Sequence, residues 1–397
     1  METVVKAKAE SSLLRWQIGL AFLAFIMIGA NDGAVGVLLP SIRAYYNVDK
    51  ATVSLLFLAG TTGYLIAAFS SGLLVQKLGT RGLLILGAGT FGLGAAVLST
   101  MPPFAVVMLT LLSLGFGVAI IDAGLNSYIA VLPRSTSLLN YLHAFYGVGA
   151  LLGPIIASSI LALEWGWNST YFLWLGLSLA LVLGFAWLFR GRTMAQKADA
   201  GGNVLATVIK LRVVWIAALF LLFYVGAEVS LGNWSYSFLT EERHEQILLS
   251  GWAVSGYWLG LTLGRLVLGR VGEKFGNKRL IQGCLVGTIV GVMLIWLVPL
   301  GAVSALGLWL TGFSLGPLFP TIIALMPSLV PARLVPSTIG FVVSLGSVGA
   351  AFWPWIAGNL AESFGLWTLL PYVILLVLVM LGIWFLIQKQ PGLKTEN

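Results

Sequence analysis

Long apolar segments follow one another along this chain of 397 residues and leave few folds open to it. A helix needs about 20 apolar residues to cross the hydrocarbon core of a bilayer. Strands of a membrane β-barrel alternate apolar and polar residues, and these segments do not. The sequence therefore predicts an all-α membrane protein with twelve transmembrane helices, near residues 16–39, 52–75, 82–100, 104–131, 139–163, 170–189, 213–239, 248–270, 280–299, 302–329, 336–360 and 367–387.

The small supply of charged residues supports this interpretation. Charged residues make up 9% of the chain and hydrophobic residues 59%, whereas about a quarter of the residues of a soluble domain are charged. So little polar surface cannot cover a water-soluble globule of this size, which excludes a soluble enzyme and a sizeable extramembrane domain. We also expect no intramembrane enzyme, because neither a nucleophile–base pair nor a metal-binding cluster stands out.

Lysine and arginine residues are distributed unequally between the two sides of the predicted membrane. The termini and the even-numbered connections carry eighteen of them, whereas the odd-numbered connections carry only Arg43, Lys50 and Arg243. The positive-inside rule then predicts that both termini are cytoplasmic, in a bacterial-type inner (plasma) membrane. The net charge of +8 reflects this topology, so we expect no nucleic-acid partner. The sequence contains no nucleotide-binding motif, so we expect no nucleotide to drive the protein.

A repeat with a spacing of about 197 residues divides the chain into two similar halves: the segment 72–81 recurs at 269–279. This repeat predicts two pseudo-symmetric six-helix bundles. The predicted boundaries are an N-terminal bundle over 1–189, a cytoplasmic linker over 190–212 and a C-terminal bundle over 213–397. Carriers built from two such bundles bind their substrate near the middle of the membrane, so we expect the functional residues there.

The two repeated segments resemble the signature loop that joins the second and third helices in each half of the major facilitator superfamily. The resemblance covers the whole chain and implies a secondary transporter that works by alternating access. The first copy carries Gln76 where an acid is usual, which argues against an ionic latch in the N-terminal half, whereas the second copy keeps the acid. The resemblance implies a cytoplasmic gate loop formed by Gly72, Lys77, Gly79, Arg81, Gly269, Glu273, Lys274, Gly276 and Arg279.

Ionisable residues within the predicted spans are the main candidates for function, because each costs about 2.5–3.5 kcal/mol at mid-membrane and should face the protein interior. A single buried acid can be a structural contact between helices, but three acids favour a functional site. Arg265 either snorkels to the membrane surface or pairs with an acid. The candidates are Asp32, Asp122, His143, Glu228 and Arg265.

The fourth and fifth predicted spans contain polar residues at helical spacing. Asp122 and Asn126 are four residues apart and share a helix face. In a low-dielectric surrounding a carboxyl group takes up a proton near neutral pH, and a nearby amide can bind substrate hydroxyl groups. His143 and Tyr146 share a face of the next span. His143 is either a substrate ligand or a satisfied structural donor.

These two spans resemble the fucose:proton symporter family, whose fourth helix carries an acid four residues before an asparagine. That matches Asp122 and Asn126, whereas the polar pair of the fifth helix is changed in type to His143 and Tyr146. The first-helix acid of the family would fall on Gly36, and this chain has Asp32 one turn earlier. The resemblance implies that Asp122, or Asp32, carries the coupling proton.

The seventh predicted span, around Tyr224-Val-Gly-Ala-Glu228, resembles the corresponding helix of the same family. A carboxylate such as Glu228 accepts hydrogen bonds from paired hydroxyl groups of a polyol. Asn233 and Trp234 follow Gly232, where we expect a break in the helix. Trp234 either stacks on a sugar ring or belongs to an interfacial belt. The Gly316-Pro317 and Pro320 positions predict a bent or broken tenth helix.

The sequence thus predicts a secondary active transporter that moves a neutral sugar or similar small polar solute by proton symport. Alternatives are an exporter of an amphipathic compound (a drug/proton antiporter) and a transport-inactive sugar sensor. We expect no cofactor besides the proton as coupling ion, no metal, and a monomer whose partners are a monosaccharide and the lipid bilayer. The predicted proton-coupling and substrate-binding residues are Asp122, Asp32, Asn126, His143, Tyr146, Glu228, Asn233 and Trp234.

Overall fold

The computed structural model describes residues 2–189 and 202–390, and all regular structure in these ranges is helical. A π-helical turn (Phe238–Glu242) and two 3-10 turns (Ala332–Leu334 and Leu366–Thr368) connect some of the α-helices. The α-helices are α1 (Glu2–Tyr46), α2 (Lys50–Ser99), α3 (Phe104–Ala130), α4 (Ser135–Ala162), α5 (Ser169–Leu188), α6 (Gly202–Val208), α7 (Arg212–Ser237), α8 (Ile247–Phe275), α9 (Asn277–Leu297), α10 (Gly301–Leu315), α11 (Leu318–Leu329), α12 (Val335–Phe364) and α13 (Leu369–Gln388).

The predicted all-α membrane fold with twelve spans is confirmed. Eleven helical stretches in the described ranges are long and apolar enough to cross a membrane. One of them, α2, has 50 residues and consists of two helices joined by a kink at Gly79, so it crosses twice. Helices α10 and α11 together form one span of 29 residues that is interrupted at Gly316-Pro317, as the sequence predicts.

One local prediction is wrong, because α7 continues without a break through Gly232 and Asn233 as far as Ser237. Gly232 instead allows close packing: a Cβ atom at this position would lie 2.8 Å from the Trp258 ring. The backbone at Asn233 packs closely against Gly36 of α1, because a Cβ atom added at Gly36 would lie 2.6 Å from the Asn233 carbonyl oxygen. The small residues in this region therefore bring helices together and do not interrupt one.

The helices pack into two compact units. Unit 1 comprises residues 1–34 and 59–198, and unit 2 comprises residues 35–58 and 199–397. The end of α1 and the beginning of α2 thus pack with the C-terminal helices. The predicted bundle boundaries remain a prediction, and residues 190–201 of the predicted linker lie outside the described residues.

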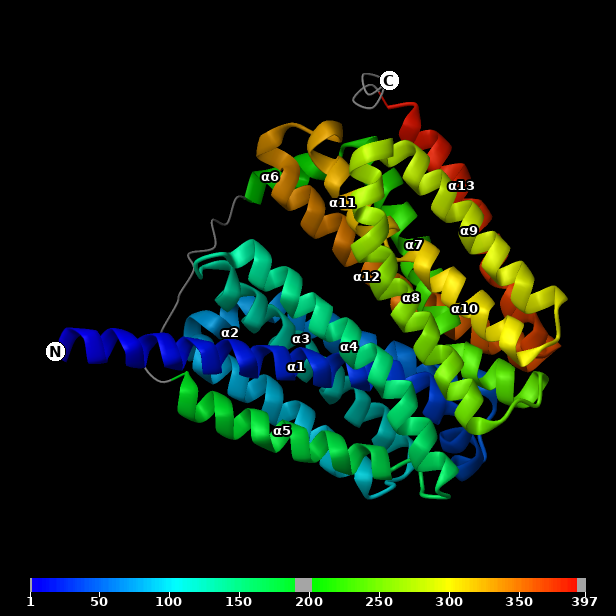
Figure 1. Ribbon diagram of the computed structural model, residues 1–397, viewed down its shortest axis with the longest axis horizontal. Helices are drawn as coiled ribbons and strands as arrows, with labels where there is room; N and C mark the ends of the chain where they lie inside the picture. Colours follow the sequence, from blue (N-terminus) through cyan, green and yellow to red (C-terminus); the bar gives the residue numbers. More distant parts are fainter. Residues whose placement is uncertain (1, 190–201, 391–397) are drawn as a thin grey trace. The chain divides into compact units, whose positions relative to one another are not determined.

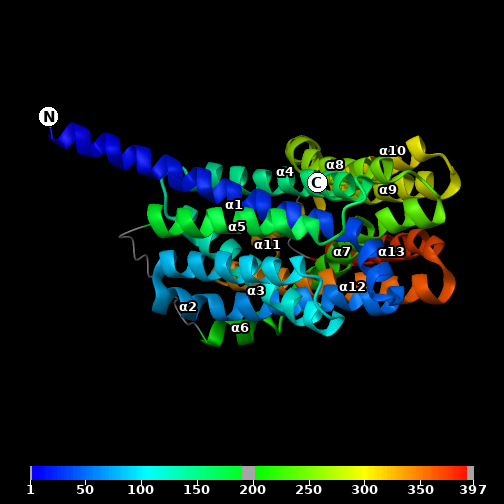
Figure 2. The ribbon, with the colours of Figure 1, turned by 90° about the horizontal axis from the view of Figure 1, so that it is seen from below.

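In unit 1, α1 and α4 lie side by side along a seam of small residues (Figures 1 and 2). A Cβ atom at Gly29 or Gly33 would lie within 2.4 Å of a main-chain oxygen of α4. One at Gly149 or Gly153 would lie within 2.2 Å of a main-chain oxygen of α1. The glycines of α1 therefore serve close helix packing, which requires small residues on both helices.

Unit 2 contains two similar seams. A Cβ atom added at Gly349 of α12 would lie 2.3 Å from the Leu222 carbonyl oxygen of α7. Gly312 of α10 would place one 2.1 Å from the Tyr257 carbonyl oxygen of α8, and Gly316 one 2.3 Å from the Leu261 carbonyl oxygen. These close approaches hold α7 against α12 and α8 against α10, and they position the polar side chains described below.

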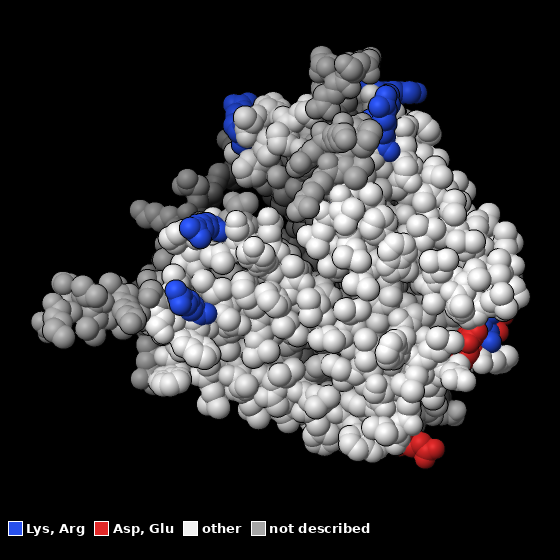
Figure 3. All heavy atoms as spheres, in the orientation of Figure 1, with Lys and Arg blue, Asp and Glu red and all other residues white. Residues whose placement is uncertain are grey.

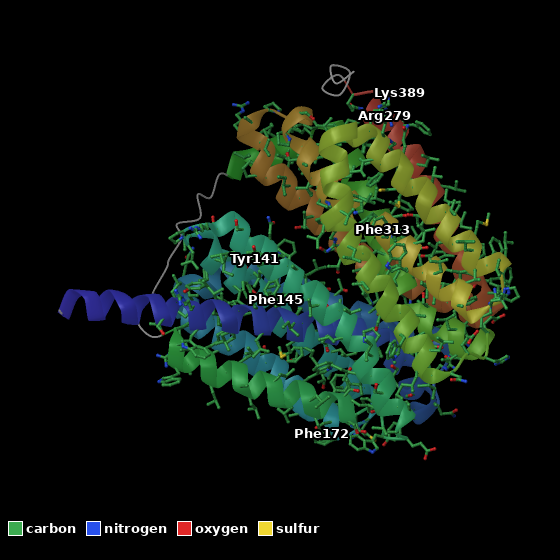
Figure 4. All side chains as sticks on the ribbon, viewed as in Figure 1. Tyr141, Phe145, Phe172, Arg279, Phe313 and Lys389 are labelled. Atoms are coloured by element: carbon green, nitrogen blue, oxygen red, sulfur yellow. The ribbon has the colours of Figure 1, made fainter. Side chains whose placement is uncertain are left out.

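The outer side chains suit a lipid surrounding. Most described atoms on the face drawn in Figure 3 belong to uncharged residues. Large apolar side chains are exposed on several helices: Phe172 of α5, labelled in Figure 4, is 56% exposed and Leu183 is 70% exposed. In unit 2, Arg279 at the start of α9 and Lys389 after the end of α13 lie at the same end of the unit (Figure 4). The chain is therefore an integral, multi-pass membrane protein.

Candidate functional site

The Asp32 carboxylate of α1 is held by two neutral donors in unit 1. The Tyr146 hydroxyl of α4 donates to Asp32 Oδ2 at 3.0 Å, and the neighbouring Asn31 amide donates to Oδ1 at 3.2 Å. The α1–α4 seam makes the first contact possible, because Gly29 lies directly against the backbone of Tyr146. Two residues predicted for the site, Asp32 and Tyr146, thus lie together.

The Asp122 carboxylate of α3 is held in the same manner. The Asn126 amide, one turn further along α3, donates to Asp122 Oδ1 at 2.8 Å, a contact that suits the four-residue spacing. The Tyr64 hydroxyl of α2 donates to Oδ2 at 3.1 Å. Asp122, Asn126 and Tyr64 are all half-buried, so the group is neither sealed in the core nor fully in solvent.

The two carboxylates and His143 belong to one electrostatic cluster. Asp32 and Asp122 lie close enough for their charges to interact, and His143 interacts with Asp122. The His143 ring is exposed and packs edge-on against Phe25 at a centroid distance of 5.5 Å. Phe145, labelled on α4 in Figure 4, stacks on Phe22 at 4.6 Å beside it.

We name Asp32, Asp122, Tyr64, Asn126, His143 and Tyr146 the unit 1 cluster. Among the described residues, no lysine or arginine nitrogen lies within 4.0 Å of either carboxylate. The hydrogen bonds to both carboxylates come from hydroxyl and amide donors, and Asp122 also interacts with the His143 imidazole. Such an arrangement allows a carboxyl group to gain and lose a proton, and the same donors can bind a polar solute.

Unit 2 contains a second polar group, in which the acid is paired with a cation. The Arg265 guanidinium of α8 lies 3.5 Å from Glu228 Oε1 of α7. The Tyr257 hydroxyl donates to the Glu228 main-chain oxygen at 2.8 Å, and the buried Tyr224 ring lies within electrostatic range of both charges. Of the two alternatives for Arg265, the structure shows pairing. We name Glu228, Arg265, Tyr224 and Tyr257 the unit 2 cluster.

Asn233 and Trp234 lie further along α7 and are buried. Trp234 is 1% exposed, and its indole N–H donates to the Pro354 carbonyl oxygen at 2.9 Å. Its ring also packs against Phe57 at a centroid distance of 6.3 Å. This burial does not match an interfacial belt residue. A substrate-binding role for Asn233 and Trp234 remains a prediction.

The hairpin 35–58 carries two of the three cations predicted on the non-cytoplasmic side, and both contact Glu241. Arg43 lies 2.9 Å and Lys50 3.9 Å from Glu241 Oε2. At the tip of the hairpin, the Asp49 carboxylate accepts the Thr52 backbone N–H at 2.6 Å, and hydrogen bonds from Thr52 lower the pKa of Asp49 below its usual value. The hairpin is therefore attached to the end of α7 by charge.

The predicted gate loops share one backbone feature. Gly79 has a φ of 65° and Gly276 a φ of 87°, a conformation that residues with a Cβ atom rarely adopt. The two glycines are 197 residues apart, so the repeat in the sequence is also a repeat in backbone geometry. Gly72, Lys77, Arg81 and Arg279 are exposed, whereas the side chains at Gly269, Glu273 and Lys274 lie outside the described residues.

Sequence reasoning missed two members of these clusters, Tyr64 and Tyr257. Tyr64 and Tyr257 lie in apolar, glycine-rich segments in which nothing marks a tyrosine as a hydrogen-bond donor to an acid. Arg265 was noticed as an ionisable residue, but its partner could not be read from spacing. A polar residue inside a predicted span was the one available signal.

Polar clusters among membrane-spanning helices are typical of multi-pass proteins that move a solute or an ion. The family model for the Major Facilitator Superfamily matches residues 21–250 and 216–397, so the chain belongs to this superfamily. It is accordingly a transporter rather than an enzyme.

Individual relatives and structures agree with this family. The chain is 29% identical over 417 residues to Bypass of stop codon protein 6 of Saccharomyces cerevisiae, covering 94% of this chain and 82% of the relative. It is 21% identical over 363 residues to the glucose/mannose transporter GlcP of Bacillus subtilis, covering 87% and 88%. It shares the fold of a D-xylose-proton symporter, with a TM-score of 0.77, 14% identity, and coverage of 96% and 99%.

Proposed function

We propose that this transporter moves a neutral sugar, or a similar small polar solute, together with a proton by alternating access. The observation that carries the proposal is the contrast between the two clusters. Asp32 and Asp122 have no lysine or arginine partner among the described residues, whereas Glu228 is paired with Arg265.

This contrast supports proton binding by the unit 1 cluster. The Glu228 carboxylate is already paired with the positive charge of Arg265. Asp32 and Asp122 accept hydrogen bonds from hydroxyl and amide donors, and a carboxyl group in such a low-dielectric surrounding can gain and lose a proton, which is what a proton carrier requires. We therefore assign proton binding to Asp122 and Asp32, and substrate contacts to the polar side chains beside them and to Glu228.

The substrate class rests on the donors and acceptors that the clusters offer. Asn126, His143 and Tyr146 provide amide, imidazole and hydroxyl groups, and Glu228 provides an acceptor for paired hydroxyl groups. This set suits a polyol. The relative that transports glucose and mannose and the neighbour that couples D-xylose to protons support the same class.

The test is uptake of labelled monosaccharides into proteoliposomes with and without an imposed pH gradient. The Asp122→Asn variant should abolish uptake driven by the gradient and retain exchange of sugar across the membrane, because exchange needs no net proton movement. The matched control is Glu242→Gln, which alters an exposed acid in the turn after α7. Wild-type uptake that ignores the gradient, together with an unchanged Asp122→Asn variant, would contradict the proposal.

A second candidate is export of an amphipathic compound, and an aromatic group in unit 2 favours it. The Trp353 ring lies 4.7 Å from the Phe223 ring and 5.1 Å from the Phe352 ring, and Phe352 is 40% exposed. Extrusion of an aromatic dye from the same proteoliposomes distinguishes the two functions. Dye extrusion without sugar uptake would replace the sugar proposal with this one.

A further inference from the structure

Arg265 makes two inward contacts with different parts of unit 2. Its Nη2 atom lies 3.5 Å from Glu228 Oε1 on α7, and its Nε donates to the main-chain oxygen of Gly316 at 3.3 Å. Gly316 lies at the junction between α10 and α11. A single planar guanidinium therefore connects the acid of the unit 2 cluster with the break in the tenth span.

The sequence explains why the Gly316 carbonyl oxygen needs this donor. In a regular α-helix, the carbonyl of residue i accepts the backbone N–H of residue i+4. For Gly316 that residue is Pro320, which has no N–H. Gly316 is buried, and its lack of a side chain lets α8 approach closely enough for Arg265 to supply the missing donor.

Of the two contacts that Arg265 makes, the one with Glu228 is longer than the one with Gly316. A separation of 3.5 Å is at the long limit of a hydrogen bond, whereas a hydroxyl group donates to an oxygen at about 2.7–2.8 Å. A ligand hydroxyl can therefore compete for the Glu228 carboxylate. The Glu228 backbone stays in place, because the Tyr257 hydroxyl holds its main-chain oxygen at 2.8 Å. Glu228 is 12% and Arg265 36% exposed, so the pair is accessible to a solute.

We propose that Arg265 is a positioning residue that couples occupancy of Glu228 to the geometry of the α10–α11 junction. When substrate hydroxyl groups satisfy Glu228, the guanidinium is released to Gly316 and holds the start of α11 more firmly. When Glu228 is unoccupied, the guanidinium is shared between both acceptors. This inference rests on the proposed function in one respect, namely that Glu228 contacts the substrate.

The first experiment measures hydrogen–deuterium exchange of residues 316–329 in the purified wild type, Arg265→Lys, Pro320→Ala and the double variant. A lysine keeps a positive charge for Glu228, but it has no counterpart of the Nε atom through which Arg265 donates to Gly316. The rate of hydrogen–deuterium exchange in this segment should therefore rise roughly tenfold in Arg265→Lys. A tenfold change corresponds to the loss of one hydrogen bond from a charged donor. Pro320→Ala restores an N–H for Gly316, so the double variant should return close to the wild-type rate.

The second experiment compares sugar binding and turnover in the same four proteins. Arg265→Lys should lower the rate of sugar exchange roughly tenfold and change the sugar Kd by less than about twofold, because the lysine keeps a positive charge beside Glu228 while the hydrogen bond to the junction is lost. The double variant should recover turnover. Lys389→Gln, which alters an exposed lysine at the end of α13 (Figure 4), is the control and should change neither quantity.

The outcomes separate this inference from the proposed function. Unchanged exchange of residues 316–329 in Arg265→Lys overturns the coupling role, and so does equal loss of binding and turnover without recovery in the double variant. A third outcome is that the wild type transports no sugar while hydrogen–deuterium exchange of residues 316–329 responds to the variants as expected. In that case the sugar assignment fails and the link between Arg265 and the junction stands.

Discussion

Replacing Gly149 by alanine tests whether the α1–α4 seam sets the geometry of the unit 1 cluster. The added Cβ atom would lie 2.1 Å from the Ile26 carbonyl oxygen and 2.8 Å from the Ala30 nitrogen, both of which are backbone atoms. Ordinary van der Waals contact begins at 3.4 Å, so the helices must part by about 1 Å. Overpacking of this kind costs about 1–3 kcal/mol in the free energy of unfolding.

The matched control is Gly176→Ala on α5, where a Cβ atom would meet nothing within 4 Å. Alanine there should stabilise the helix by up to about 1 kcal/mol, because it favours the helical state over glycine. The free energies of unfolding of the two variants should therefore differ by about 2 kcal/mol or more. Tryptophan fluorescence during unfolding in detergent measures this difference.

The same substitution should affect function, because Tyr146 lies one turn before Gly149 on α4. Parting the helices weakens the 3.0 Å hydrogen bond from the Tyr146 hydroxyl to Asp32. The pH profile of uptake should then move to higher pH, since a carboxylate that loses a donor holds its proton more tightly. Equal stability of Gly149→Ala and Gly176→Ala, with an unchanged pH profile, would refute the reasoning.

Three further outcomes follow from the geometry. Tyr64→Phe removes the hydroxyl that donates to the Asp122 carboxylate. The pH profile of uptake should then move upward by about one pH unit, because a hydrogen bond to a charged group is worth about 1.5 kcal/mol. An unmoved profile contradicts this. Glu241→Gln should destabilise the protein by about 1 kcal/mol at low salt and speed hydrogen exchange of the hairpin 35–58, whereas Glu242→Gln should do neither. The lowered pKa of Asp49, caused by hydrogen bonds from Thr52, predicts a stabilising contribution that is present above the usual carboxyl pKa and lost as pH falls below it, so the melting temperature of Asp49→Asn should depend less on acidic pH than that of the wild type.

The class of the protein could be predicted from the sequence because a bilayer imposes strict rules on a chain. Within lipid every backbone polar group must be satisfied inside the protein, so long apolar segments become helices. A single proline is not enough to interrupt such a helix, because Pro40 lies inside α1 and Pro154 inside α4. The interruption at Gly316, Pro317 and Pro320 was equally predictable, since a glycine followed by two closely spaced prolines removes two backbone donors within one turn. The same holds for Gly79 and Gly276, whose backbone conformation only glycine adopts readily.

Contacts between helices were decided by tertiary structure. The spans are apolar on most sides, so no stripe in the sequence marks which face of a helix is turned inward. The hydrogen bond from Tyr64 to Asp122 and the pairing of Arg265 with Glu228 depend on how neighbouring helices are rotated and shifted, which residue spacing within one helix does not encode. For the same reason the break expected at Gly232 was wrong. A glycine in a sequence signals missing side-chain volume, and only the neighbouring Trp258 shows that this space is used for packing.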